Sequence, residues 1–232
     1  MWYKLKRILI YPDGVTEKQV YPAWWKPLNP KCWYKFDWDY TDSTWNFWVA
    51  SWTSTFQTLS SGIQVLQTDG SNLVLLPSWC TDTAINTYTI AFWMKTITTS
   101  PNYWYYAWAW NEQLDFYENT SWRCLYVRPW WAIDKTVSWL TDWWRLVIIR
   151  CNWTTTVNQL INGWNSQSTT GSTGSIFWYS YWFAIWWRWP NAAASTWQRT
   201  SIQMSNFVIS HSYWDDATCI AMYDGTKSNY WL

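Results

Sequence analysis

Residues 87–95 read TYTIAFWMK, an alternating pattern that is typical of a β-strand. Successive side chains of a β-strand point to opposite faces, so Tyr88, Ile90, Phe92 and Met94 share one face. This alternation predicts a half-buried strand. The rest of the chain is built from similar short segments.

Other segments repeat the β pattern with turn residues between them. Residues 146–149 (LVII) are apolar on both faces, which predicts a central strand covered twice. The Asn162-Gly163 pair after residues 154–161 predicts a hairpin, because Asn-Gly suits a type I′ turn. A further strand is expected at residues 207–209, and the sole helix, a short one, at residues 215–223. The whole pattern is typical of an all-β sandwich or barrel.

The first 31 residues look like a separate arm. Strands are predicted at residues 5–11 and 15–21 around Pro12-Asp13-Gly14, followed by a Pro-rich linker over residues 22–30. A lone hairpin is marginally stable, so we expect residues 1–31 to attach to the main domain or to a neighbouring subunit in a larger assembly. Residues 32–232 form the main domain.

Charge and hydropathy exclude several function classes. Sixteen basic and fifteen acidic residues give a net charge of +1, which predicts no nucleic-acid partner. Residues 1–11 contain too short an apolar run for a secretory signal, and residues 176–189 are too short for a membrane helix. The five cysteines, Cys32, Cys80, Cys124, Cys151 and Cys219, show no metal-site spacing, and we expect buried thiols.

Tryptophan is unusually frequent and glycine unusually rare. The chain has 29 Trp and 7 Gly, whereas average usage predicts roughly sixteen glycines. Many indoles stand at turn-like positions, where a positive φ favours glycine. One interpretation is a Trp-rich protein such as a sugar binder. The other is that many of these positions are glycine in the living cell, in an organism or virus that reads the UGA codon as glycine.

Residues 36–46 (FDWDYTDSTWN) resemble the F-D-G-x-x-x-D-S-S-G-N opening of laminin-G-like, concanavalin-A-like jelly-roll domains, provided that Trp38 and Trp45 stand for glycine. Four later segments resemble family motifs in the same order: residues 88–95, 140–147, 160–163 and 183–187. The chain ends at residues 207–209 and 220–223, like the family's last strand and closing helix.

The resemblance implies a two-sheet antiparallel jelly-roll sandwich with one short C-terminal helix, preceded here by the N-terminal β-hairpin arm. It also sorts the tryptophans. Trp93 and Trp144 stand where the family has Trp, so we expect core indoles there. The family has glycine or a tight turn at the remaining matched positions, Trp38, Trp45, Trp143, Trp164, Trp186 and Trp187.

The fold also hosts glucanases, which need two carboxylates about 5–5.5 Å apart in one cleft. Glu112 and Glu118 would share a strand face but lie far apart, and Asp115 would face away. His211, the single histidine, lies between two serines and is expected to be exposed. We therefore expect no enzyme and assign no catalytic residue.

Two binding chemistries stay open. Calcium is possible at a loop rim, with Asp69, Asp82 and Asp142 as candidates, although Asp is common in turns anyway. We assign no cofactor and no metal ligand. Sugar binding would use aromatic platforms, for which Tyr103, Tyr105 and Tyr106 are candidates, although aromatic residues also suit sheet packing.

These expectations favour a non-enzymatic recognition or structural module. The first hypothesis is a virion-associated, tail-fibre-like protein that binds a glycan or a cell-surface ligand, with the arm docked to the virion. The alternative is a bacterial cell-surface adhesion or polysaccharide-binding domain at the extracellular surface. A glycoside hydrolase is the least favoured hypothesis.

Overall fold

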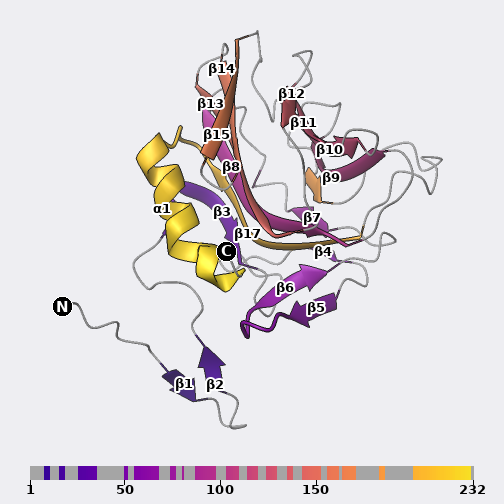
Figure 1. Cartoon of the computed structure of the whole chain (residues 1–232), viewed down its shortest axis with the longest axis vertical. Helices are drawn as coiled ribbons and strands as arrows, with labels where there is room; N and C mark the ends of the chain where they lie inside the picture. The colour runs from indigo at the N-terminus through magenta and orange to yellow at the C-terminus, as the bar shows by residue number, and fades with distance from the viewer. Residues whose placement is uncertain are drawn as a thin grey trace.

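Two antiparallel sheets face each other in the computed structural model (Figure 1). The structure describes residues 26–35, 55–67, 80, 87–97, 143–152 and 201–230 with their side chains, and further strands by their backbone alone. The all-β sandwich with a short C-terminal helix is confirmed.

The larger sheet has eight strands. Seven follow the order β15 (Trp164–Thr170), β14 (Thr156–Ile161), β13 (Arg145–Asn152), β8 (Tyr88–Thr96), β17 (Ile202–Ser210), β6 (Gln64–Gln67) and β5 (Thr55–Thr58), and β3 (Pro30–Tyr34) pairs with β17 beside β6. The smaller sheet follows the order β12 (Lys135–Val137), β11 (Cys124–Pro129), β10 (Leu114–Asn119), β9 (Tyr103–Ala109), β16 (Phe183–Ile185), β7 (Val74–Leu76) and β4 (Ala50–Ser51).

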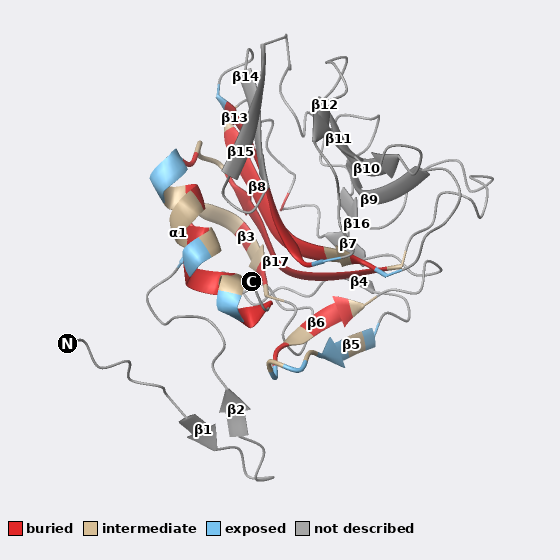
Figure 2. Ribbon diagram, viewed as in Figure 1, coloured by how far each residue is buried: buried red, intermediate tan, exposed pale blue. Residues whose placement is uncertain are grey.

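Strand β8 lies at the centre of the larger sheet and is buried on both faces, so the prediction of a half-buried strand was wrong (Figure 2). Phe92 stacks on Phe207 of β17, with ring centroids 5.9 Å apart, on the face that meets the smaller sheet. Ala91 and Trp93 lie on the other face, against the helix. The sequence cannot reveal this second layer because the helix follows more than 100 residues later. The doubly covered strand predicted at residues 146–149 is confirmed within β13.

Helix α1 (Asp216–Thr226) covers the outer face of the larger sheet (Figure 1). Asp215 caps it, because its side chain accepts a hydrogen bond of 2.7 Å from the Thr218 backbone N–H. The helix runs three residues beyond the predicted end and continues as η4 (Lys227–Asn229). Cys219 and Met222 of the helix pack into one cluster with Trp93, Leu146, Ile148 and Val208 of the sheet.

Strand β17 pairs with β8 along one edge, where its register shifts between Ser205 and Val208, and with β6 and β3 along the other edge. Residues 203–204 pair with β6, and residues 207–210 pair with β3. Asn206 has a φ of 54°, which lies in the left-handed region that asparagine tolerates better than most residues. Its N–H donates to the Lys35 carbonyl (3.1 Å), and its side-chain oxygen accepts from Trp33 Nε1 (3.1 Å).

Two predicted hairpins are present. Strands β1 (Ile8–Ile10) and β2 (Thr16–Lys18) form a separate two-stranded sheet, shorter than the strands expected in the arm. Strands β14 and β15 pair with Ile161 opposite Trp164, so Asn162-Gly163 stands between them as expected. Trp164 is thus the first residue of β15 rather than a turn residue.

Candidate ligand-binding surface

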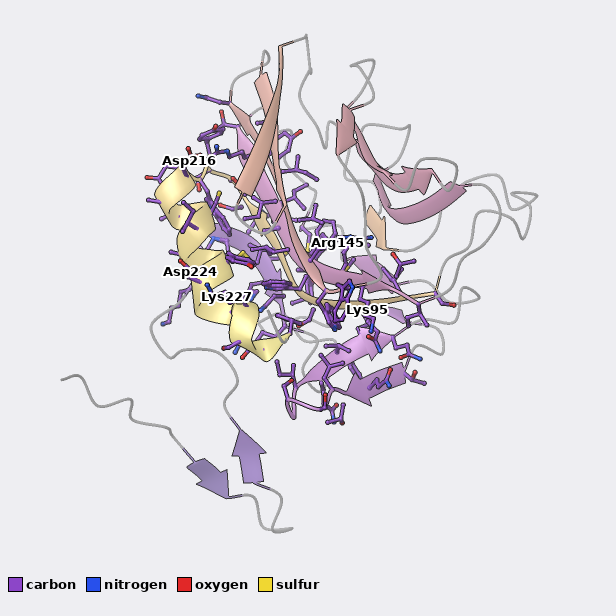
Figure 3. All side chains as sticks on the ribbon, viewed as in Figure 1. Lys95, Arg145, Asp216, Asp224 and Lys227 are labelled. Carbon is purple, nitrogen blue, oxygen red and sulfur yellow. The ribbon has the colours of Figure 1, made fainter. Side chains whose placement is uncertain are left out.

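The outer face of the larger sheet continues past α1 toward β5 and β6. There, Lys95 of β8 is in register with Gln203 of β17, and Gln203 is in register with Gln67 of β6. Residues directly opposite each other on an antiparallel pair share a face. Figure 3 shows Lys95 at the end of the larger sheet that adjoins β6, away from the labelled side chains of the helix.

Three glutamines at this end form a hydrogen-bonded cluster. Gln203 Nε2 donates to Gln67 Oε1 (3.0 Å) and also to Gln57 Oε1 of β5. The Gln203 side chain is central and only 7% exposed, whereas Gln67 is half-buried and Gln57 is exposed. We call Gln57, Gln67, Lys95 and Gln203 the amide–ammonium surface.

Trp93, Trp144 and Tyr230 pack together in the same buried cluster as Cys219 and Met222 of α1. Trp144, directly before β13, is 6% exposed and packs at 4.8 Å, centroid to centroid, against Tyr230. Tyr230 also stacks on Trp93 at 4.2 Å, and its hydroxyl donates to Ser205 Oγ (3.0 Å). The prediction that Trp93 and Trp144 are core indoles is confirmed.

Two large apolar side chains are exposed at the same end of the sheet. Trp143 is 68% exposed and Ile97, directly after β8, is 42% exposed. The backbone φ of Trp143 is not positive, so the local conformation does not itself require glycine. Arg145 lies two residues further along and is buried, and its Nη2 donates to Thr96 Oγ1 (3.0 Å). Four other tryptophans at family glycine positions lie outside the described residues: Trp38, Trp45, Trp186 and Trp187.

The remaining predicted polar residues do not converge on a catalytic site in the described part of the chain. Asp115 and Glu118 lie three residues apart in β10, and Glu112 lies outside the described residues. His211, just after β17, is half-buried, so the prediction of an exposed histidine was wrong.

The structure describes only some of the residues that were candidates for calcium or sugar binding. Asp69, Asp82 and Asp142 lie outside the described residues, and the described ones contain no group of three or more residues able to hold a metal ion. Tyr103, Tyr105 and Tyr106 belong to β9, in the middle of the smaller sheet between β10 and β16. Tyr105 pairs with Tyr117 of β10.

Four of the cysteines are buried thiols, as expected: Cys32, Cys80, Cys151 and Cys219. Burial raises the pKa of the Cys219 thiol to about 11, although nearby Arg150 opposes the shift. Burial likewise raises the pKa of the Tyr88 hydroxyl well above its usual range. Both groups therefore stay neutral at physiological pH. Cys124 lies in β11.

Sequence reasoning missed the amide–ammonium surface. Residues 55–58 (TFQT) and 64–67 (QVLQ) are short polar strands, and nothing in their spacing links them to Gln203. The sheet order alone brings them together, across 136 residues between Gln67 and Gln203. The sequence gives only a weak signal for this surface. Its alternating pattern places Gln57 and Gln67 in strands but does not indicate which other strands lie beside them.

None of the helices in the described part of the chain has the length and apolar character needed to cross a membrane. No family model and no curated protein matches the chain.

Solved structures do match. Domain 4 of AbnA, a GH43 extracellular arabinanase from Geobacillus stearothermophilus, in complex with arabinotriose, is similar with a TM-score of 0.64 and 16% identity over 85% of this chain and all of that one. The binding domain of Paraclostridial Mosquitocidal Protein 1 has a TM-score of 0.64 at 13% identity over 84% of this chain. The binding domain of botulinum neurotoxin DC, in complex with rat synaptotagmin II, has a TM-score of 0.62 at 12% identity over 85% of this chain.

The chain spans about half of each toxin domain, 52% in both cases. At these identities the likeness shows the fold. The chain therefore has the β-sandwich fold that is also found in these binding domains.

Proposed function

We propose that this chain is a non-enzymatic recognition module that binds a glycan at the amide–ammonium surface. The observation that carries the proposal is the pair of hydrogen bonds from Gln203, which hold the amides of Gln57 and Gln67 in fixed positions beside Lys95. Sugar sites need a few polar groups held in place, because ordering free side chains on binding costs free energy. The similar arabinanase domain in complex with arabinotriose supports this interpretation.

A polysaccharide panel tests the proposal through affinity electrophoresis of the whole chain. The double variant Gln57→Ala/Gln67→Ala should weaken binding by roughly tenfold or more, because it removes two hydrogen-bonding amides. Gln64→Ala is the matched control, since Gln64 also lies in β6 but bonds Thr58 (3.3 Å) and not the cluster. The proposal fails if the chain binds no polysaccharide, or if the double variant and the control bind equally well.

A surface protein is the second candidate ligand. The exposed side chains of Trp143 and Ile97 favour it, because large exposed apolar groups are enriched where proteins meet. The similar neurotoxin domain is in complex with a protein, synaptotagmin II. Trp143→Ala should then abolish capture of the protein ligand while leaving polysaccharide binding unchanged.

We further propose that the module is virion-associated, with residues 1–31 as the attachment arm and residues 32–232 as a laminin-G-like jelly-roll domain. The separate β1–β2 sheet supports an arm that carries its own strands. The alternative is a bacterial cell-surface adhesion or polysaccharide-binding domain. Genes next to the coding sequence discriminate between them: capsid and terminase genes support the virion, and secretion genes support the cell surface.

Finally, we propose that six tryptophans are glycine in the native protein: Trp38, Trp45, Trp143, Trp164, Trp186 and Trp187. Trp143 is exposed, whereas Trp93 and Trp144 are buried. This difference supports the division that the family motifs imply, with tryptophan at positions 93 and 144 and glycine at position 143. The intact mass of protein from its natural source tests it, since each glycine removes one indolylmethyl group. A mass that fits 29 tryptophans would refute the reassignment. The amide–ammonium surface contains no tryptophan, so glycan binding does not depend on this outcome, whereas capture of a protein ligand through the Trp143 indole requires tryptophan at that position.

A further inference from the structure

We infer that the ligand of the amide–ammonium surface is an acidic glycan, one whose sugars or linkages carry an oxyanion. The inference rests on the proposed function and names its ligand class. It follows from two properties of the four residues: they offer a ligand mainly hydrogen-bond donors, and they carry a positive charge.

The cluster offers mainly donors to a ligand. The side-chain amide of Gln203 has two N–H groups, which bond the carbonyl oxygens of Gln67 and Gln57. Those two carbonyl oxygens are thereby engaged, and the Nε2 groups of Gln57 and Gln67 keep their N–H donors for a ligand. Because Gln203 is almost fully buried, this orientation is set before any ligand arrives.

The charge at this surface is positive. Lys95 is half-buried in register with Gln203, so its side chain lies against the cluster and supplies a positive charge that attracts an anion. The carboxylates among the described side chains are all elsewhere, on α1 and its cap, and each has a partner. Asp215 accepts from Thr218, Asp216 pairs with Arg150, and Asp224 pairs with Lys227 at 2.6 Å.

A neutral sugar would use the amide donors but would leave the ammonium without a counter-charge. A carboxylate or phosphate oxygen accepts from both kinds of donor, and such charge-assisted bonds are about twice as strong as neutral ones. Nucleic acid also carries phosphates, but it requires an extended basic surface, whereas the whole chain has a net charge of +1.

Affinity electrophoresis of the whole chain in three polymers tests the inference: polygalacturonate, its carboxyl-reduced neutral form, and polyglycerol phosphate. We expect retardation by an acidic polymer. Polygalacturonate alone would identify a carboxylate and polyglycerol phosphate alone a phosphate as the group bound. Lys95→Gln should weaken acidic-polymer binding by roughly tenfold, the usual scale for losing one charged hydrogen bond. Lys95→Arg should retain most of the affinity.

Lys26→Gln is the control, because Lys26 is exposed in the linker and its loss changes the net charge equally. If Lys26→Gln weakens binding as much as Lys95→Gln, the attraction is nonspecific and the inference fails. Binding to the neutral polymer alone would overturn the acidic ligand and leave the glycan-binding proposal standing. Binding to none of the three polymers, nor to any member of the polysaccharide panel, would overturn both. Matching thermal midpoints for the variants exclude unfolding as the cause.

Discussion

The outer face of the larger sheet is divided into two regions with different chemistry. Under α1, indoles and aliphatic side chains are packed away from water, and their polar atoms bond within the protein: Trp93 Nε1 donates to Thr226 Oγ1 at 2.8 Å. Beyond η4, the same face presents glutamine amides and a lysine. The extent of the helix therefore decides which part of the sheet is core and which part can meet a ligand.

The largest expected effect lies beneath the helix. Trp93→Ala should reduce the free energy of unfolding by about 3–5 kcal/mol, the range for a large buried aromatic side chain. The variant removes the stack on Tyr230 and leaves Thr226 without its indole partner. Urea unfolding measures the loss. Trp143→Ala should change stability by less than about 0.5 kcal/mol, because that indole is 68% exposed. Similar losses for both variants would contradict the division of the face.

The second largest loss in the free energy of unfolding is expected from substitution of Arg150. Its guanidinium is buried under the start of α1, donates to the Trp214 carbonyl (2.7 Å), pairs with Asp216 and lies 4.8 Å from the Tyr213 ring centroid. Arg150→Ala should cost about 1.5–3 kcal/mol, the range for hydrogen bonds to a charged group. Asp216→Asn should cost less than about 1 kcal/mol, because that side chain is 75% exposed. A larger loss from Asp216→Asn than from Arg150→Ala in urea unfolding would reverse this assignment.

Alkaline pH should weaken the helix-covered region through Cys219. Its pKa is about 11 in the folded protein against an ordinary value of 9.0, so the unfolded chain loses this proton first as pH rises. Stability is therefore fully present below pH 9 and falls between pH 9 and 11, by roughly 1 kcal/mol at pH 10. Cys219→Ala should flatten this part of a stability–pH profile measured by urea unfolding. An unchanged slope would show that another group, such as Tyr88, accounts for it.

The smallest effect is expected at the helix start. Hydrogen bonds from Thr218 lower the pKa of Asp215, so the cap stabilises α1 above the ordinary carboxyl pKa and loses this contribution as pH falls. Asp215→Ala should lower the thermal midpoint at pH 7 more than at pH 3. Asp215→Ser, which keeps an accepting oxygen, should lower it less. Equal losses at both pH values would mean that the carboxylate does not act as the cap.

The parts of the fold that were predictable have local causes. Residues 146–149 are apolar on both faces, and Asp215 precedes a helix with a side chain suited to capping. The sequence predicts only residues 207–209 of β17, which runs over Ile202–Ser210 and also contains the polar pair Ser205-Asn206. The structure accommodates this pair inside the strand through bonds to Lys35, which lies 170 residues away from Ser205 in sequence.

The candidate site was not predictable for a related reason. Its residues come from β5, β6, β8 and β17, whose adjacency depends on the order of strands in the completed sheet. Single glutamines in polar strands carry no signature of a site. The aromatic candidates Tyr103, Tyr105 and Tyr106 belong to β9 of the smaller sheet, whereas the proposed surface lies on the larger sheet and contains amides and a lysine.

The attachment of β3 and its preceding residues to β17 has a consequence for biosynthesis. The Leu28 carbonyl accepts from Trp214 Nε1 (3.1 Å) and from Ser210 Oγ (2.6 Å), contacts that span 186 and 182 residues. A chain emerging from the ribosome must therefore expose the edges of β3, β6 and β8 until residues 202–214 have been synthesised. Closing loops of this length slows folding, so we expect the nascent chain to be prone to aggregation until these residues have been added.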